Sequence, residues 1–302
     1  MGIGHYIKEI GRGREGARAL TREQAADLMA QILDSSNTGQ VTDLEIGAFC
    51  LAMRIKGETP QEMAGFLDAV HARLKHITAP TKGPVVVLPS YNGARRLPVL
   101  TPLLAHLIAR EGVNVVIHGT ATESNRITSE EVLNAMQEIQ SPEHRTSQVK
   151  FVPTESLCPA LKRLLDVRRV VGLRNPAHSL VKLMNPVQGE ALLISSYTHP
   201  EYAVSMAATL ELTGARALLL RGTEGEAVAD ARRTPQIDAF IRGVRTSLVE
   251  AQTGPLTQLP DLPTQIDAAT TARYTHAVLA GALPVPKPLT QQVQAVLQAL
   301  EL

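Results

Sequence analysis

The sequence is poor in aromatic residues and in cysteine, and it carries almost no net charge. Of its 302 residues none is Trp, four are Phe and five are Tyr, which disfavours a nucleic-acid site built on several stacked rings. Two cysteines, Cys50 and Cys158, are too few for a disulfide framework in a chain of this length. Because the net charge is only +1, any affinity for a polyanion has to come from local clusters of cations.

Long apolar runs and the common catalytic motifs are also missing. No stretch approaches 18 apolar residues, and the first residues lack the apolar run of a secretion signal. The sequence contains no Walker loop, no His-Glu-x-x-His, no paired-cysteine metal motif and no Gly-x-Ser-x-Gly elbow. We therefore expect a soluble, cytoplasmic protein without a membrane segment, a metal centre or a cofactor.

The first eighty residues contain three helix starts of the same kind. At Thr21, Thr42 and Thr59 a threonine is followed three residues later by Glu or Gln, so that each side chain can bind a backbone amide of the other. Apolar residues follow each start at helical spacing. This pattern predicts a small all-α domain over residues 1–78.

From residue 85 onward, short apolar runs alternate with helical patterns. The strands are expected at 85–88, 113–117, 191–195 and 215–220, with helices near 101–112, from 128 and over 199–213. Such alternation predicts an α/β domain over residues 79–302, with a mainly parallel sheet flanked by helices. A further helical segment, at about 154–172, is expected to pack back on the first helices and complete the helical domain.

Basic side chains follow several of the expected strands. Arg95 and Arg96 come after the first, His118 ends the second and Arg221 ends the last. Because ligands of an open parallel sheet bind beyond the carboxyl ends of its strands, these side chains are candidates for one site. His118 at a strand end is either a base, a donor that orients a ligand, or a structural residue.

Two windows of the sequence contain cations but no acid. Residues 84–110 and 167–189 lack Asp and Glu, and the second holds Arg174 and Lys182. This local excess of positive charge favours a surface for an anion or a polyanion. The basic residues Lys8, Arg12 and Arg14 form a third cluster near the N-terminus.

The acids Glu224 and Glu226 flank Gly225 close to Arg221. They could share a cation. A solvated turn is the simpler interpretation, and we expect that one.

The chain resembles the anthranilate phosphoribosyltransferase family in motifs spread over most of its length. These motifs are Ala52–Pro60, His118-Gly119, Gly172-Leu173-Arg174, Asn185-Pro186 and Arg216–Gly222. The resemblance implies the nucleoside phosphorylase/phosphoribosyltransferase-like fold, with a cleft that faces the helical domain, and a homodimer through the helical domains. In this family, the arginine that matches Arg174 holds the substrate carboxylate.

The chain departs from the family where the donor and its metal bind. The family's glycine-rich diphosphate loop falls on Pro89–Gly93, where the side chains of Pro89 and Tyr91 hinder close approach of a phosphate to the backbone amides. The magnesium-binding Asp-Glu pair falls on Ala227-Val228, and neither residue can replace a carboxylate ligand. Both losses argue against phosphoribosyl transfer from the usual diphosphate donor.

The segments 89–96 and 221–226 resemble a divergent branch of the family, the YbiB-type proteins. This resemblance implies sequence-independent binding of DNA or RNA without catalytic residues. The expected phosphate contacts are Arg95, Arg96, Arg174, Lys182 and Arg221, supported by Lys8, Arg12 and Arg14. The former catalytic cleft is expected to hold Tyr91, Asn92, His118 and Glu224.

Two alternatives to nucleic-acid binding remain open at this point. One is a phosphoribosyltransferase of altered donor or acceptor specificity that uses His118 and Arg174. The other is a dimeric scaffold with an inert cleft.

Apolar residues of the helical domain also predict self-association. Five of them offer more apolar surface than one small helical layer can cover: Ile46, Phe49, Met53, Met63 and Phe66. Part of this surface is expected to face the α/β domain and part a second copy, which gives a homodimer with two basic grooves.

Overall fold

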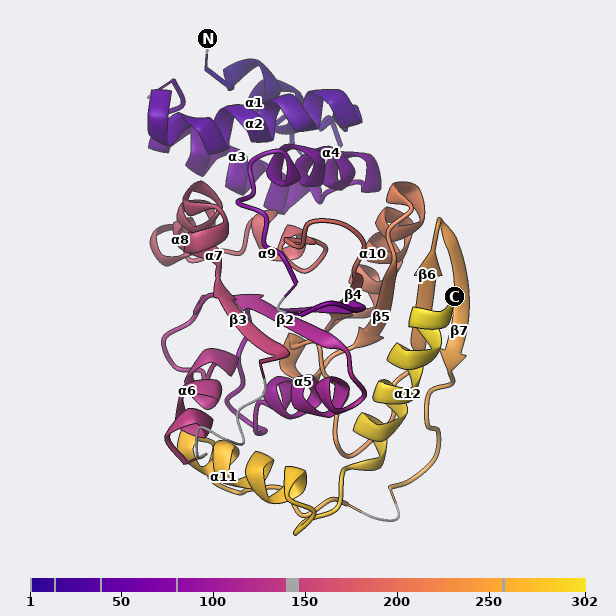
Figure 1. Cartoon of the computed structure of the whole chain (residues 1–302). Coiled ribbons are helices and arrows are strands. Elements are labelled where there is room, and N and C mark those ends of the chain that lie inside the picture. Colours follow the sequence, from indigo (N-terminus) through magenta and orange to yellow (C-terminus); the bar gives the residue numbers. More distant parts are fainter. Residues whose placement is uncertain (1, 14, 39, 80, 140–146, 257–258) are drawn as a thin grey trace. The chain divides into compact units, whose positions relative to one another are not determined.

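The computed structural model describes residues 2–13, 15–38, 40–79, 81–139, 147–256 and 259–302, which form two compact units (Figure 1). The helical unit consists of residues 1–76 and 153–186, and the α/β unit consists of residues 77–152 and 187–302. Each unit is therefore built from two separate segments of the chain.

The helices of the helical unit are α1 (Gly4–Ile10), α2 (Arg22–Thr38), α3 (Asp43–Lys56), α4 (Pro60–His71), α7 (Thr154–Leu157), α8 (Pro159–Val171) and α9 (Ala177–Leu180). Three of them, α2, α3 and α4, begin where the capping residues predict. The reciprocal hydrogen bonds at Thr21, Thr42 and Thr59 are all formed, which confirms the three predicted starts. Gly65 lets α4 approach α2 closely, because a Cβ at this position would lie 2.1 Å from the carbonyl oxygen of Arg22.

Glu62 joins the start of α4 to two other segments of the helical unit. Its buried carboxylate closes the capping box at Thr59 and accepts a hydrogen bond of 2.9 Å from the backbone N–H of Leu20. It also forms an ion pair of 2.6 Å with Lys56 Nζ. Because the carboxylate is fully buried, these partners together offset the cost of removing its charge from water.

The apolar surface that was expected to drive self-association is covered in the single chain. None of the five residues is more than 5% exposed, and Phe49 and Phe66 pack edge to face with ring centroids 6.0 Å apart. The expectation that these side chains leave surface for a second copy is therefore wrong. Other apolar side chains on α3 and α8 stay exposed instead: Leu44, Leu51, Ile55 and Val170.

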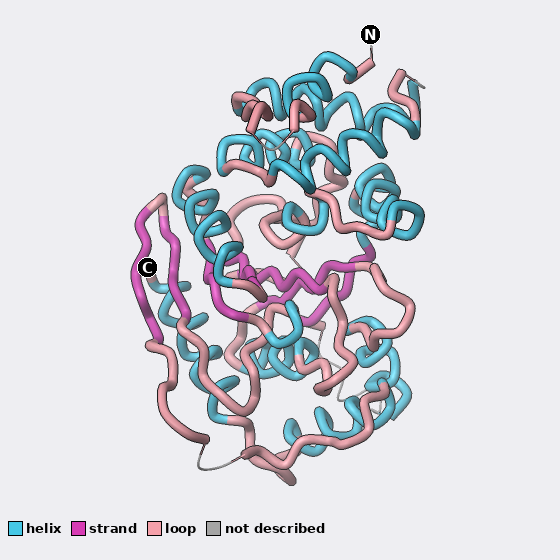
Figure 2. Tube along the Cα trace, turned by 180° about the vertical axis from the view of Figure 1, so that it is seen from behind, coloured by secondary structure: helices cyan, strands magenta, loops and turns pink. Residues whose placement is uncertain are grey.

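The α/β unit contains a sheet of seven strands in the order β3-β2-β1-β4-β5-β6-β7. The strands are β1 (Val85–Ser90), β2 (Asn114–Gly119), β3 (Val149–Pro153), β4 (Leu192–Tyr197), β5 (Ala217–Arg221), β6 (Ile237–Ile241) and β7 (Val244–Val249). The pairs β1–β2, β1–β4 and β4–β5 are parallel, whereas β6 and β7 form an antiparallel hairpin at one edge (Figure 2). The predicted mainly parallel sheet is confirmed.

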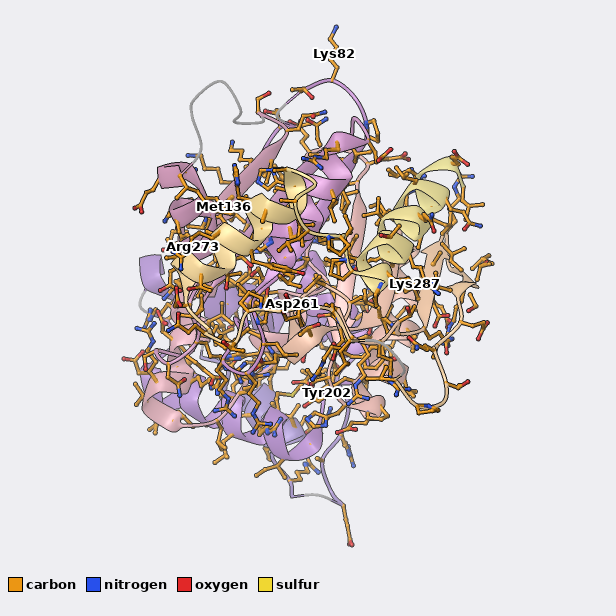
Figure 3. All side chains as sticks on the ribbon, turned by 90° about the horizontal axis from the view of Figure 1, so that it is seen from below. Lys82, Met136, Tyr202, Asp261, Arg273 and Lys287 are labelled. Carbon is orange, nitrogen blue, oxygen red and sulfur yellow. The ribbon has the colours of Figure 1, made fainter. Side chains whose placement is uncertain are left out.

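The hydrophobic core of the α/β unit lies between one face of the sheet and four helices. These are α5 (Thr101–Arg110), α6 (Ser129–Ile139), α11 (Ala268–Leu279) and α12 (Lys287–Glu301). Met136 of α6 lies beside α11, the helix that carries Arg273 (Figure 3). Helix α10 (Pro200–Thr213) packs against β4 and β5, and its buried residues lie outside this core.

The parallel strands end together at one edge of the sheet, called here the carboxyl edge. Ser90 at the end of β1 pairs with Gly119 at the end of β2, and Tyr197 at the end of β4 pairs with Arg221 at the end of β5. This arrangement brings the segments that follow β1, β2 and β5 to one place, as the sequence predicts.

We expect His106 on α5 to make folding sensitive to acid. Burial, with a smaller contribution from the charge of Arg110, lowers the pKa of His106 from 6.5 to about 4. Because the pKa of His106 is lower in the folded state than in the unfolded one, acid protonates the unfolded chain first. The contribution of His106 to the free energy of unfolding is therefore complete above pH 6.5 and is lost as the pH falls towards 4. In urea unfolding at a series of pH values, His106→Gln should flatten the loss of stability over this window, and His276→Gln, at an exposed site, should not. If His106→Gln left the dependence of stability on pH unchanged, His106 would not be the residue that makes folding sensitive to acid.

Candidate functional site

The loop of residues 90–97 follows β1 at the carboxyl edge of the α/β unit. Its path depends on Gly93, which has a φ of +62° and whose Cβ, if present, would lie 2.6 Å from the carbonyl oxygen of Ile127. Ala94 and Ile127 form an isolated antiparallel bridge next to this glycine. The 90–97 loop is thus fixed against the segment that leads into α6.

A carboxylate of the chain itself occupies the start of this loop. Glu226 Oε1 accepts hydrogen bonds from the backbone N–H groups of Asn92 (2.9 Å) and Gly93 (2.8 Å). Glu226 Oε2 lies 2.5 Å from Ser90 Oγ and 3.1 Å from Thr101 Oγ1. Glu226 is only 1% exposed, so the expected solvated turn is wrong for this residue. A buried carboxylate is stable here because donors surround it.

The hydroxyl of Ser129 completes the network around Glu226. It lies 2.8 Å from Ser90 Oγ and 3.5 Å from the carboxylate. Because a hydroxyl has one proton, Ser90 donates to the shorter contact, the carboxylate, and accepts from Ser129. We call the residues Ser90, Asn92, Gly93, Thr101 and Ser129 the Glu226 pocket.

A second carboxylate, that of Glu224, binds the other half of the loop. It accepts hydrogen bonds from the backbone N–H groups of Arg96 (2.9 Å) and Leu97 (3.0 Å), with a longer contact of 3.3 Å from the N–H of Arg95. Arg126 pairs with the same carboxylate at 3.4 Å. The backbone of Glu224 has a φ of +51°, which residues other than glycine rarely adopt. The contacts of its carboxylate hold it in this conformation.

Both acids of the 222–226 turn therefore bind the 90–97 loop and are not arranged around a shared cation. The turn approaches its own backbone closely, because a Cβ at Gly222 would lie 1.9 Å from the carbonyl oxygen of Glu226. Within the described residues, no group of three or more His, Cys, Asp or Glu side chains is placed to hold a metal ion.

The residues in the positions of the family's magnesium ligands are part of the hydrophobic core. Ala227 and Val228 are each 1% exposed and belong to the cluster between the sheet and its helices. Gln292 of α12 supports this segment by donating to the carbonyl oxygen of Ala227 at 3.0 Å. These positions offer a metal ion neither a charged ligand nor access.

Tyr91 and His118 form a buried pair beside the loop. The Tyr91 hydroxyl lies 2.8 Å from His118 Nδ1, and the two rings meet edge to face with centroids 5.4 Å apart. Tyr91 is 4% exposed and His118 is fully buried. The arrangement favours the structural role for His118, because a general base has to reach the proton that it abstracts.

The predicted phosphate contacts are divided between the two units. Arg95, Arg96 and Arg221 are exposed in the α/β unit, at the carboxyl edge. The helical unit carries Lys8, Arg12, Arg174 and Lys182. Arg14 lies outside the described residues.

The predicted cations of the helical unit differ in exposure. Lys8 and Arg12 are exposed, and Arg12 pairs with Glu9 at 2.6 Å. Arg174 is half-buried, whereas Lys182 is buried at 8% exposure. Of these four side chains, Lys182 is thus the least suited to contact a ligand at the surface.

The chain is similar to known proteins in sequence. Residues 5–73 match the helical bundle domain of the glycosyl transferase family. Over 97% of this chain and 92% of the relative, the sequence is 40% identical to YbiB, an uncharacterised protein of Escherichia coli strain K12. Every described helix is too short or too polar to cross a membrane.

Solved structures share its fold. The crystal structure of anthranilate phosphoribosyltransferase from Thermus thermophilus matches with a TM-score of 0.72 and 23% identity, over 95% of this chain and 85% of that one. The enzyme from Saccharomyces cerevisiae in complex with PRPP and Mg matches with a TM-score of 0.68 and 13% identity, over 96% of this chain and 85% of that one. These likenesses confirm the expected fold, a helical N-terminal domain with an α/β domain.

We expect the Tyr91→Phe variant to be less stable but to bind ligands at the carboxyl edge as before. Removing the phenolic hydroxyl takes a hydrogen-bond partner from a buried ring nitrogen, which costs about 1–2 kcal/mol. Urea unfolding measures this cost, and a gel-shift assay with oligonucleotides measures binding. A variant of unchanged stability that lost binding would show instead that Tyr91 contacts the ligand.

Proposed function

We propose that the chain, which belongs to the anthranilate phosphoribosyltransferase-like family of glycosyl transferases, binds DNA or RNA and does not transfer a phosphoribosyl group. In the loop that matches the family's diphosphate loop, the amides of Asn92 and Gly93 are already bound by the carboxylate of Glu226. Binding is expected to be independent of sequence, since arginines that contact phosphates position a strand without reading its bases.

The observation that carries this proposal is the pair Arg95 and Arg96. Both side chains are exposed, while their backbone N–H groups are held by Glu224. The fixed backbone lowers the entropy that is lost when the guanidinium groups bind a phosphate. Guanidinium is also the side-chain group best suited to a phosphate, since it donates two parallel hydrogen bonds.

Arg221 extends the same surface along the carboxyl edge. It is exposed at the end of β5, three residues before Glu224, and its strand neighbour is Tyr197 at the end of β4. Tyr197 is half-buried there, and its ring is proposed as a stacking partner for a base. The cations of the helical unit, Lys8, Arg12 and Arg174, are proposed as further contacts.

Two observations weigh against the alternative transferase. The positions of the magnesium ligands, Ala227 and Val228, are in the hydrophobic core. The backbone amides of Asn92 and Gly93, which a diphosphate would need, are occupied by Glu226. A donor diphosphate therefore has neither its metal nor its hydrogen-bond donors in this arrangement.

We expect the double variant Arg95→Glu, Arg96→Glu to bind all oligonucleotide sequences at least tenfold more weakly than the wild type. The reason is the loss of two phosphate contacts and the addition of two repelling charges. In gel-shift titrations, log affinity of the wild type for duplex DNA should fall linearly with log salt, with a slope of about 0.9 per phosphate contacted, and the slope should be smaller in the variant.

The matched control is Arg273→Glu, Lys287→Glu, which makes the same change of charge on α11 and α12 (both residues are labelled in Figure 3). This variant should bind nearly as the wild type does. Equal weakening by both double variants would show that net charge, and not the carboxyl edge, determines affinity. Absence of binding at low salt would contradict the proposed function itself.

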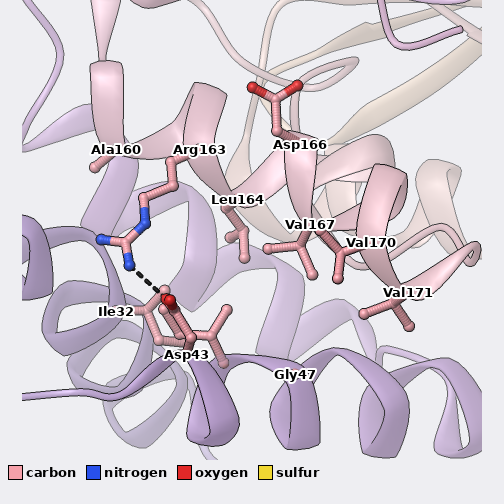
Figure 4. A pocket seen from close by; sticks show the side chains of 11 residues that line it. Ile32, Asp43, Gly47, Ala160, Arg163, Leu164, Asp166, Val167, Val170 and Val171 are labelled. Atoms are coloured by element: carbon pink, nitrogen blue, oxygen red, sulfur yellow. Dashed lines mark hydrogen bonds and ion pairs between the residues drawn. The ribbon is translucent and has the colours of Figure 1, made fainter.

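We also propose that the chain forms a homodimer through its helical unit. A pocket of about 300 Å³ opens between α3 and α8, lined mainly by apolar side chains that include Val167, Val170 and Val171 (Figure 4). Arg163 and Asp43 form an ion pair of 2.6 Å at this pocket. Val170, on the same helix as Arg163, is 89% exposed. An apolar surface of this kind is suited to a symmetric contact with a second copy.

We expect the mass in solution to be twice 32.5 kDa at micromolar concentration, by light scattering. Val170→Asp should shift the equilibrium towards the monomer, because it buries a charge in the contact. The control is Val204→Asp on α10, a valine of similar exposure in the α/β unit (73%), which should remain dimeric. A wild-type mass of 32.5 kDa would contradict the dimer.

A further inference from the structure

We propose that a second pocket, in the C-terminal part of the α/β unit, binds a small zwitterion with an apolar body, namely an amino acid or a short peptide with both termini free. The pocket has a volume of about 380 Å³, the size of a small-molecule site. Its lining comes from α11, from the start of α12 and from the loops that precede both helices. All of these residues belong to the α/β unit, and the inference does not depend on nucleic-acid binding.

The segment that leads into α12 gives the pocket a rigid apolar wall. Four of the lining residues are prolines: Pro260, Pro284, Pro286 and Pro288. A proline ring fixes its own φ and has no N–H that needs an acceptor. The segment is also joined to α11, because the N–H of Leu283 donates to the carbonyl oxygen of Ala277 at 3.2 Å. The apolar body of a ligand can pack on this wall.

The wall at Gln252 is held in place as well. The guanidinium of Arg233 donates to the carbonyl oxygens of Gln252 and Gly254, at 3.1 and 3.0 Å. The N–H of Gln252 donates to the carbonyl oxygen of Thr234 at 3.0 Å. Both walls are thus formed before a ligand arrives, so little entropy is lost in shaping the site.

The start of α12 gives the pocket a positive end. Lys287 is the first residue of this helix of 15 residues, no side chain caps the helix, and Pro288 has no N–H. Neither the ammonium nor the backbone N–H of Lys287 has a partner among the described residues. Together with the helix dipole, these two donors favour a carboxylate.

A second cation at the pocket, Arg232, is already neutralised. Its guanidinium donates to both carboxylate oxygens of Asp230, at 2.9 and 2.7 Å. Lys287 therefore carries the uncompensated positive charge of the site.

Asp261 gives the same pocket a negative group. It is exposed and has no ion-pair partner in the part of the chain that the structure describes (Asp261 and Lys287 are labelled in Figure 3). A ligand with a carboxylate alone would be repelled by Asp261, and a ligand with an amine alone would be repelled by Lys287. A molecule that carries both an ammonium and a carboxylate is complementary to both charges.

The hydroxyl of Tyr274 also lacks a partner at this pocket. Tyr274 is only 7% exposed, and no group of the described residues forms a hydrogen bond with its hydroxyl. Burial raises the pKa of this phenol and the charge of Asp261 raises it further, so the two groups lie near each other. A buried hydroxyl is rarely without a hydrogen bond, and a ligand beside Asp261 would supply the missing partner.

The test is a calorimetric titration of the whole chain with leucine and with leucyl-leucine, which hold their two charges at different distances. At least one should bind at millimolar concentration, and the tighter of the two shows whether the site takes an amino acid or a peptide. Its acetylated form, which lacks the ammonium, and its amidated form, which lacks the carboxylate, should each bind about tenfold more weakly.

Two variants assign each charge of the ligand to its partner. Asp261→Asn should weaken binding of the tighter ligand about tenfold and leave binding of its acetylated form unchanged, and Lys287→Gln should do the same with respect to the amidated form. The matched controls are Glu190→Gln and Lys82→Gln, which remove exposed charges elsewhere in the α/β unit and should bind as the wild type does.

Tyr274→Phe separates a binding role of the hydroxyl from a structural one. Because the hydroxyl has no partner among the described residues, its removal should leave the melting temperature unchanged while it weakens binding several-fold. A lower melting temperature with unchanged affinity would contradict the placement of this hydroxyl at the ligand.

Two results would overturn the proposal as a whole. One is the absence of binding of both leucine and leucyl-leucine. The other is equal binding of the free and the capped forms, which would show an apolar pocket that does not recognise charge. Because the titration contains no nucleic acid, either result leaves the gel-shift result untouched.

Discussion

The hydrogen bonds of Glu226 are the constraint on which the carboxyl edge of the sheet depends. One buried carboxylate joins the end of β1, the starts of α5 and α6, and the turn after β5. Without an internal anion, the amides of Asn92 and Gly93 and the hydroxyl of Ser90 would be buried without an acceptor or would need a ligand. The exposed arginines of the loop, Arg95 and Arg96, lie on a backbone that this interaction and that of Glu224 hold in place.

In this arrangement the backbone amides of the loop and its positively charged side chains have different partners. The inner half of the loop, at Asn92 and Gly93, is closed by Glu226, whereas the outer half keeps its guanidinium groups at the surface. A surface arginine can exchange between phosphates of a long polyanion, but a buried amide pair holds one anion in one orientation. The edge therefore carries exposed positive charge, while the amides of Asn92 and Gly93 are already occupied by a carboxylate of the chain.

Much of the fold could be predicted from local patterns, because the signals lie within a few residues of each other. The capping boxes at Thr21, Thr42 and Thr59 and the apolar runs of β1, β2, β4 and β5 are of this kind. The sequence pattern does not predict the β6–β7 hairpin, since four of the six residues of β7 are exposed and none is buried. The role of Glu226 depends on partners up to 136 residues away in sequence, and its one local signal was the apolar run Ala227-Val228-Ala229 that follows it.

The interleaving of the two units has a consequence for the order of events during synthesis. The helical unit lacks residues 153–186 until those residues have left the ribosome, and by then the chain of β1, β2 and β3 has already emerged. The helical unit can therefore fold to completion only after the first segment of the α/β unit has emerged, and not in the usual order of one finished domain after another. Helices α1 to α4 emerge before their partner α8, and β1 emerges before its partner β4. The nascent chain therefore exposes unpaired apolar surface for longer than a chain of two consecutive domains would.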